Sequence, residues 1–132
     1  MTRYLALDLG ERRIGLAVGD DAGGIATPLP SLRRRSHRAD VDALRATVRD
    51  ERAEVLLIGL PLTLRGEEGP QAGRARSLGE RLASDLGMAH EYLDERLTTS
   101  AAERLRSGRR FDVDSAAAAL LLQQHLDRRR VR

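Results

Sequence analysis

The sequence predicts an α/β fold with a five-stranded mixed sheet, in which a three-strand antiparallel meander is followed by two parallel strands, flanked by helices. Three observations predict it. Two alternating strand-like runs near the N-terminus are joined by a short glycine turn, an unbroken apolar run follows in mid-chain, and stretches with helical periodicity separate the later strand signals. A hairpin followed by alternating helices and strands favours a mixed sheet over a uniformly parallel one.

The first three strands are expected to form the antiparallel meander. Residues 4–9 and 14–18 alternate in polarity around the turn GERR, and a third extended segment is expected around Ile25–Leu32. Because side chains alternate along a strand, Leu5, Leu7 and Leu9 share one face, and Asp8 lies on the other face with Tyr4 and Ala6. Asp is depleted in strands, so Asp8 is a candidate functional residue.

Helix and strand signals alternate over the rest of the chain. Apolar spacings of three and four predict a helix over Ala39–Arg52, and the run VLLIGL within Glu54–Leu60 is typical of a central parallel strand covered on both faces. Pro70 suits the first position of a helix that ends at Leu86, before Gly87. The remaining expected elements are a strand over Met88–Leu93, a helix from Thr99 or Ser100 with a Ser100–Glu103 capping box, and a last helix over Val113–Leu126.

Length and composition exclude several classes of protein. A chain of 132 residues suits one domain over residues 1–132 and is too short for two lobes around a cleft. It has no cysteine, which excludes disulfides, zinc–thiolate sites and thiol catalysis. There is no signal-peptide pattern and no apolar stretch long enough to span a membrane, so we expect a cytoplasmic protein without a membrane partner.

The charge pattern favours a phosphate-bearing partner. All 23 basic residues are arginine, against 20 acidic residues, and arginine clusters at 33–35 and near the C-terminus. Guanidinium groups bind phosphate in a bidentate manner, which suits a nucleic-acid backbone, although an arginine-biased solvated surface explains the same pattern. With only two Tyr and one Phe, the chain lacks the stacking platforms of single-strand binders, so backbone contacts are the expected mode.

Five acids are candidates for one site. Asp8 lies in a strand, Asp94 and Glu95 follow another, and Asp112 and Asp114 stand at the start of the last helix. Carboxylates gathered at one sheet edge repel each other unless a cation lies between them, and Mg²⁺ prefers such oxygen ligands together with phosphate oxygens.

Each of these acids also has a purely structural explanation. Asp112 is best explained as a helix cap, and capping and ligation are equally compatible with Asp114. Asp94 and Glu95 point to opposite sides of an extended backbone, so only one faces the site, and spacing does not choose between them.

Four segments carry a resemblance to a known family. In order, LALDLGERRIGLAVGD, VLLIGLPLTLRGEEGP, LDERLTT and VDSAAAALLL resemble the motifs of the YqgF/RuvX family of ribonuclease H-like proteins over nearly the whole chain. The resemblance implies a ribonuclease H-like fold and a metal-dependent nuclease. Its expected role is maturation of the 5′ end of pre-16S rRNA, or processing of branched DNA in the manner of Holliday-junction resolvases in DNA repair or recombination.

The resemblance also implies site residues. Asp8, Glu95 and Asp114 correspond to the catalytic metal ligands, which would hold one or two Mg²⁺ or Mn²⁺ ions. Asp94 becomes a supporting or surface residue, and Asp112 stands where the family more often has a basic residue, which leaves its role open.

Seven further residues are candidates for nucleic-acid contacts. The family motif marks a loop after the mid-chain strand, and such a loop before a helix N-terminus can offer N–H groups to phosphate, although a plain connection looks the same. The candidates are Gly59, Pro61 and Arg65 in this motif, Arg12 and Arg13 in the hairpin turn, and Arg74 and Arg76 on the following helix, where arginine more often forms a solvated face.

Two rival classes of function compete with the nuclease. The hairpin DLGERRIGLAV also resembles the phosphate-binding hairpin of actin-like ATPases and sugar kinases, but those proteins need two lobes. The other rival is a nucleic-acid-binding assembly factor with a weak or idle acidic site. Junction resolution needs two active sites, so a homodimer is a further hypothesis for a protein acting on structured RNA or branched DNA.

Overall fold

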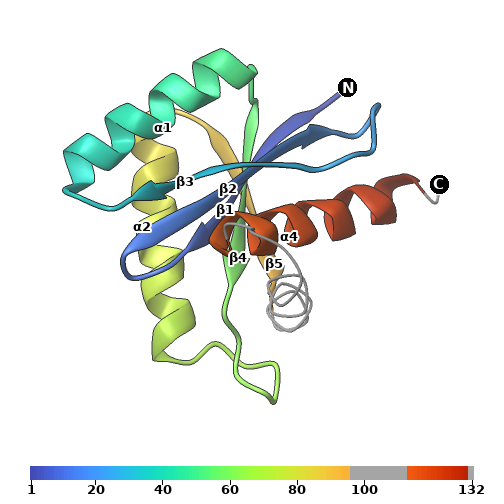
Figure 1. Ribbon diagram of the computed structural model, residues 1–132. Coiled ribbons are helices and arrows are strands. Elements are labelled where there is room, and N and C mark those ends of the chain that lie inside the picture. Colours follow the sequence, from blue (N-terminus) through green and yellow to red (C-terminus); the bar gives the residue numbers. More distant parts are fainter. Residues whose placement is uncertain (96–112, 131–132) are drawn as a thin grey trace.

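The computed structural model describes residues 1–95 and 113–130 of the chain (Figure 1). The expected helix near Ser100, its capping partner Glu103, and Asp112 therefore lie outside the described residues.

The described residues contain one five-stranded sheet in the order β3-β2-β1-β4-β5, which confirms the predicted mixed architecture. β1 pairs antiparallel with β2, which pairs antiparallel with β3, whereas β1 pairs parallel with β4 and β4 parallel with β5. The strands are β1 (Arg3–Leu9), β2 (Arg13–Asp20), β3 (Thr27–Arg33), β4 (Val55–Leu60) and β5 (Ala89–Asp94). β3 contains two prolines, which lack a backbone N–H. They suit its place at the sheet edge, because an edge strand forms hydrogen bonds to a neighbour on one side only.

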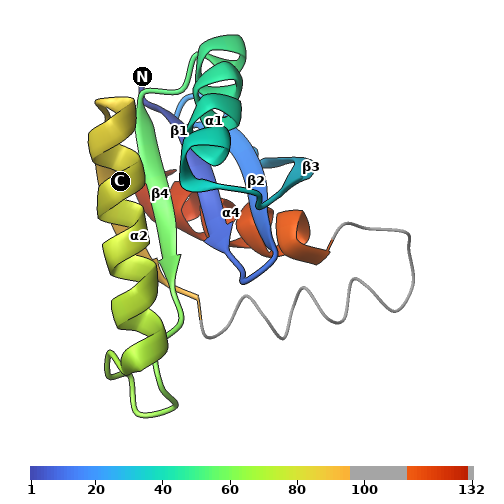
Figure 2. The same ribbon diagram turned by 90° about the vertical axis from the view of Figure 1, so that its left-hand side faces the viewer.

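The helices cover both faces of this sheet (Figures 1 and 2). α1 (His37–Glu51) and α2 (Pro70–Leu86) pack on the face that carries Leu5 and Leu7, and α4 (Val113–Arg130) packs on the face of Tyr4 and Ala6. This is the predicted alternation of β1. No helix within the described ranges is long and apolar enough to cross a membrane.

Most element boundaries depart from the predictions by one or two residues, and the end of α4 departs by four. α1 begins at His37 rather than Ala39, because Ser36 caps it and its Oγ accepts the Ala39 N–H at 3.1 Å. β4 has parallel neighbours on both sides and is buried from Leu56 to Leu60, as its apolar run predicts. α4 continues to Arg130, because its solvated last turn carries no helix-ending residue.

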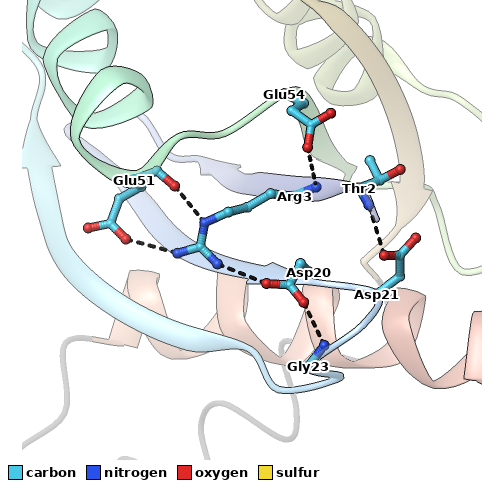
Figure 3. A network of polar contacts seen from close by, with 7 residues as sticks. All are labelled: Thr2, Arg3, Asp20, Asp21, Gly23, Glu51 and Glu54. Carbon is cyan, nitrogen blue, oxygen red and sulfur yellow. Dashed lines mark hydrogen bonds and ion pairs between the residues drawn. The ribbon is translucent and has the colours of Figure 1, made fainter.

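The edge where the parallel strands begin is held by a polar network, which we call the amino edge (Figure 3). The Arg3 guanidinium lies between Asp20 at the end of β2 and Glu51 at the end of α1, 3.2 Å from a carboxylate oxygen of each. The Arg3 N–H donates to Glu54 at 3.2 Å. One side chain thus ties three elements together before the chain enters the core.

Candidate active site

The opposite edge of the sheet, where β1, β4 and β5 end, collects the candidate acids, and we call it the carboxyl edge. Parallel strands present their carboxyl ends on the same side, so Asp8 near the end of β1 and Glu95 directly after β5 come to one place. The Glu95 N–H donates to the Leu60 carbonyl at 3.2 Å, which extends the chain of β5 along the end of β4. The topology therefore brings together residues that are 87 positions apart.

Asp8 and Glu95 contact each other directly through a hydrogen bond between their carboxyl groups. Burial raises the pKa of Asp8, the hydrogen bond from Glu95 lowers it, and the negative charge of Asp114 raises it. Burial, the charge of Asp8 and the hydrogen bond raise the pKa of Glu95 to about 8, with a further contribution from Asp94. Glu95 is therefore the protonated donor of the pair at neutral pH, where two ionised carboxyl groups would repel each other.

Gly59 provides the space that Glu95 occupies. A Cβ built on Gly59 would collide with Glu95 Oε2 and would come within 3.3 Å of Leu121 Cδ2 in α4. Leu7 pairs with Ile58 in the parallel ladder, and the next residues in the two strands are Asp8 and Gly59. A side chain at residue 59 would thus fill the position from which the Glu95 carboxyl group reaches Asp8.

Gly15, on the other side of Asp8, provides the space for the start of α4. It is the antiparallel partner of Asp8, and a Cβ on it would collide with the Asp114 carbonyl. Ser115 fixes this close approach, because its buried Oγ accepts the Leu16 N–H at 3.1 Å where β2 and β3 shift register. Glycines thus lie on both sides of Asp8. Gly59 leaves space for the Glu95 carboxyl group, and Gly15 leaves space for the backbone of Asp114.

Asp114 stands at the margin of the Asp8–Glu95 pair. Its charge affects the pKa of Asp8, which places it electrostatically in the same site. Within residues 1–95 and 113–130, however, no three His, Cys, Asp or Glu side chains are close enough together to hold a metal ion as they stand. The donor chemistry fits a hard divalent cation, because two half-buried carboxyl groups are in contact and a third is near, but Asp114 does not complete the cluster.

The candidate nucleic-acid residues occupy three different settings. Arg12 and Arg13 are exposed at the β1–β2 turn, and Arg65 is exposed in a tight loop closed by Thr63, whose N–H donates to the Glu67 carbonyl at 2.9 Å. Pro61 and Arg74 line a groove beside α2. Arg76 differs, because its Nε and Nη2 each donate to a Glu68 carboxylate oxygen at 2.9 Å and its Cζ lies 4.4 Å from the centre of the Tyr92 ring.

Two residues of the site, Gly15 and Ser115, escape sequence reasoning, and they hold the start of α4 beside Asp8. The motif does mark Gly59, but as a candidate contact to nucleic acid, whereas in the structure it leaves space for Glu95. A glycine inside a strand is itself a signal of close approach by another group. The partner of each glycine lies in another segment, however, and only the fold reveals it.

Comparisons with known proteins agree with the motifs. A family model described as "RuvX: Holliday junction resolvase" matches residues 2–128. The chain belongs to the RuvX family.

Curated relatives in the RuvX family align over nearly their whole length. A protein of Anaeromyxobacter sp. is 46% identical over 134 residues, covering 96% of this chain and 98% of that protein. One of Acaryochloris marina is 42% identical over 132 residues, covering 95% and 92%. Both are named "Putative pre-16S rRNA nuclease".

Solved structures support the fold of this RuvX-family chain. The structure titled "T. thermophilus RuvC in complex with Holliday junction substrate" matches with a TM-score of 0.58, covering 98% of this chain and 96% of that one. The sequence identity is 16%, so this likeness bears on the ribonuclease H-like fold alone.

Proposed function

We propose that this protein is a divalent-metal-dependent nuclease that hydrolyses phosphodiester bonds of nucleic acid at the carboxyl edge. The observation that carries the proposal is the half-buried Asp8–Glu95 carboxyl pair, for which Gly59 leaves the space. Holding two half-buried carboxyl groups in contact is unfavourable for folding, and perturbed carboxyl pairs of this kind cluster at functional sites. A divalent cation is the partner that suits them.

In this proposal each residue has a defined role. Asp8 and Glu95 would hold Mg²⁺ or Mn²⁺, with Asp114 as the third carboxylate, and the bound ion supplies an activated water and charge stabilisation at the phosphate. Gly59 and Gly15 keep the neighbouring strands clear of the acids, and Ser115 holds the first turn of α4 in place. Exposed arginines of the β1–β2 turn and the Thr63–Glu67 loop neutralise the phosphate backbone.

The names of the relatives support a proposal for the substrate. The curated relatives are named for pre-16S rRNA, and the family description names the Holliday junction. We propose structured precursor rRNA as the first substrate to test and branched DNA as the second. Action on a junction would call for a dimer with two carboxyl edges.

A cleavage assay with a matched acid variant tests the proposal. Purified protein is incubated with precursor-like structured RNA and with a four-way DNA junction over a range of Mg²⁺ and Mn²⁺ concentrations. We expect metal-dependent cleavage that falls by about a thousandfold in Asp8→Asn, because loss of a metal ligand removes several kcal/mol of transition-state stabilisation. The exposed acid Asp50 supplies the control Asp50→Asn, which should cut like the wild type.

Two outcomes contradict the proposal. Cleavage that survives in Asp8→Asn excludes the carboxyl edge as the catalytic site. Binding without cleavage at any metal concentration favours the rival class, an assembly factor with an idle site. The observation that favours this rival is that Asp114 does not lie close enough to Asp8 and Glu95 to form a three-carboxylate metal site with them.

A further inference from the structure

A groove runs along α2 on the face of the sheet opposite to α4. Its main part, of about 810 Å³, lies between the β1–β2 turn and α2 and is lined by Leu9, Gly10, Pro61, Arg74, Leu78 and Arg81, among others. A second hollow of about 290 Å³ shares Arg34, Leu78 and Arg81 with it and reaches the start of α1. The two hollows therefore adjoin each other, and we call them together the α2 groove.

The α2 groove carries more basic than acidic side chains. Arginines 34, 35, 74 and 81 line it, and so does His37, whose Nε2 lies 2.6 Å from Asp85 Oδ2. Its acids are Glu11, which lines both hollows, and Asp40, which is buried with its carboxylate accepting the Arg35 N–H at 3.0 Å. Among the described residues no Phe, Tyr or Trp lines either hollow, so the groove suits a charged backbone rather than stacked bases.

The α2 groove begins beside the carboxyl edge. Leu9 and Gly10 directly follow Asp8, and Pro61 directly follows Leu60, whose carbonyl accepts the Glu95 N–H. Asp8 faces α4 while Leu9 faces α1 and α2, so the acids and the groove lie on the two sides of one sheet edge. In Figure 2 the β1–β2 turn and the first half of α2 lie at the same end of the molecule. A nucleic-acid strand bound at the acids would therefore reach the groove by crossing this edge of the sheet.

Arg34 differs from the helical arginines of the groove. Its guanidinium donates to the Gly10 carbonyl at 2.8 Å, and its N–H donates to the Arg12 carbonyl at 2.8 Å. It therefore supports the β1–β2 turn as well as contributing charge. Arg74 and Arg81 are exposed on α2, seven residues or about two helical turns apart, so both project from the same side of the helix. Substitution of Arg74 and Arg81 therefore removes charge from the groove without removing a buried side chain.

We propose that the α2 groove binds the sugar–phosphate backbone of the substrate strand that continues beyond the cleaved bond, with Arg74 and Arg81 as positioning residues. Because it reads phosphates, the groove accepts RNA and DNA and tolerates any base sequence. The choice of ligand rests on the proposed function, since the groove adjoins the site at which cleavage is proposed.

Binding is measured without cleavage, in EDTA and in the Asp8→Asn background, so that failure of the nuclease proposal does not affect the readout. The probes are a fluorescein-labelled RNA hairpin with single-stranded extensions on both sides, its DNA counterpart, and the blunt hairpins. We expect Arg74→Ala/Arg81→Ala to weaken binding of the extended hairpins about tenfold. The salt slope should fall by about 1.4, from two lost phosphate contacts at about 0.7 each.

The control pair is Arg49→Ala/Arg128→Ala, which removes two exposed arginines near the amino edge, outside the groove lining. It should change binding less than twofold, and the blunt hairpins should bind the groove variant nearly as well as the parent. An equal loss on blunt and extended hairpins, an equal loss in the control, or no loss at all overturns the proposal. A loss of binding affinity seen for the RNA probes alone or for the DNA probes alone contradicts the claim that the groove contacts only the phosphate backbone.

Discussion

The amino edge and the carboxyl edge of the same sheet use acidic residues in opposite ways. At the amino edge, Asp20 and Glu51 each lie 3.2 Å from the Arg3 guanidinium. At the carboxyl edge, Asp8 and Glu95 face each other, and burial together with neighbouring acids raises the pKa of both. The first arrangement stabilises the fold, whereas the second lowers its stability, as expected of the cation site proposed above.

The difference predicts that changes at the carboxyl edge impair activity and changes at the amino edge impair stability. We state the tests below in order of decreasing expected effect. Each compares a variant at one edge with a matched variant elsewhere.

After the roughly thousandfold loss expected of Asp8→Asn, Gly59→Ala gives the next largest expected effect. The added methyl group takes the place of Glu95 Oε2 and crowds Leu121, so Glu95 is pushed away from Asp8. Displacing a ligand by an ångström or more lowers cleavage by about a hundredfold. The cleavage rate per folded molecule measures this loss. A rate equal to that of the wild type would show that cleavage does not require Glu95 in that position.

A second glycine separates this effect from the general effect of adding a methyl group. Gly73 in α2 has no atom within 4 Å of a Cβ built on it. Gly73→Ala should therefore raise the free energy of unfolding by up to about 1 kcal/mol, because alanine is the better helix former. Chemical denaturation checks this value beside that of Gly59→Ala.

Arg3→Ala probes the amino edge. It removes the partner of both Asp20 and Glu51 and the bond to the Glu51 carbonyl, so we expect the free energy of unfolding to fall by about 2 kcal/mol. Cleavage per folded molecule should not change. Arg49→Ala, which removes an exposed pair with Asp50, should cost under about 0.5 kcal/mol. A lower cleavage rate per folded molecule in Arg3→Ala would contradict the claim that the amino edge affects stability alone.

Ser115→Ala is expected to act on both stability and activity. It leaves the buried Leu16 N–H without its acceptor, which costs about 1–2 kcal/mol, and it loosens α4 where Asp114 meets Gly15. Cleavage should fall by a few-fold. The exposed helix cap Ser36 is the comparison, since Ser36→Ala should cost about 1 kcal/mol and leave cleavage as it was. Equal rates in the two variants would separate Ser115 from the site.

The sequence predicts much of the fold because local signals and sheet periodicity agree. The face alternation of β1 and the doubly covered β4 follow from the pattern of apolar residues alone. The start of α1 is misplaced by two residues because periodicity finds the apolar face of a helix, whereas its first residue depends on the Ser36 cap.

The candidate site is less accessible to sequence reasoning. Spacing brings Asp8 to the carboxyl edge but does not distinguish Asp94 from Glu95, and the family motif selects Glu95. The structure places Glu95 against Asp8. The space that Gly15 and Gly59 leave beside Asp8, and the grouping of Arg74 with Arg34 and Arg81, become visible only when strands and helices distant in sequence are brought side by side.

Thermal unfolding with and without Mn²⁺ is the most direct test of the carboxyl edge as a cation site. Mn²⁺ at roughly 100 times its Kd should stabilise the wild-type protein by about 2.7 kcal/mol. Asp8→Asn should show no response to the metal and, without metal, should be at least as stable as the wild type, because the mutual repulsion of the acids is relieved. Asp50→Asn should respond like the wild type. An equal metal response in wild type and Asp8→Asn, or no response in the wild type, would contradict a metal site at this edge.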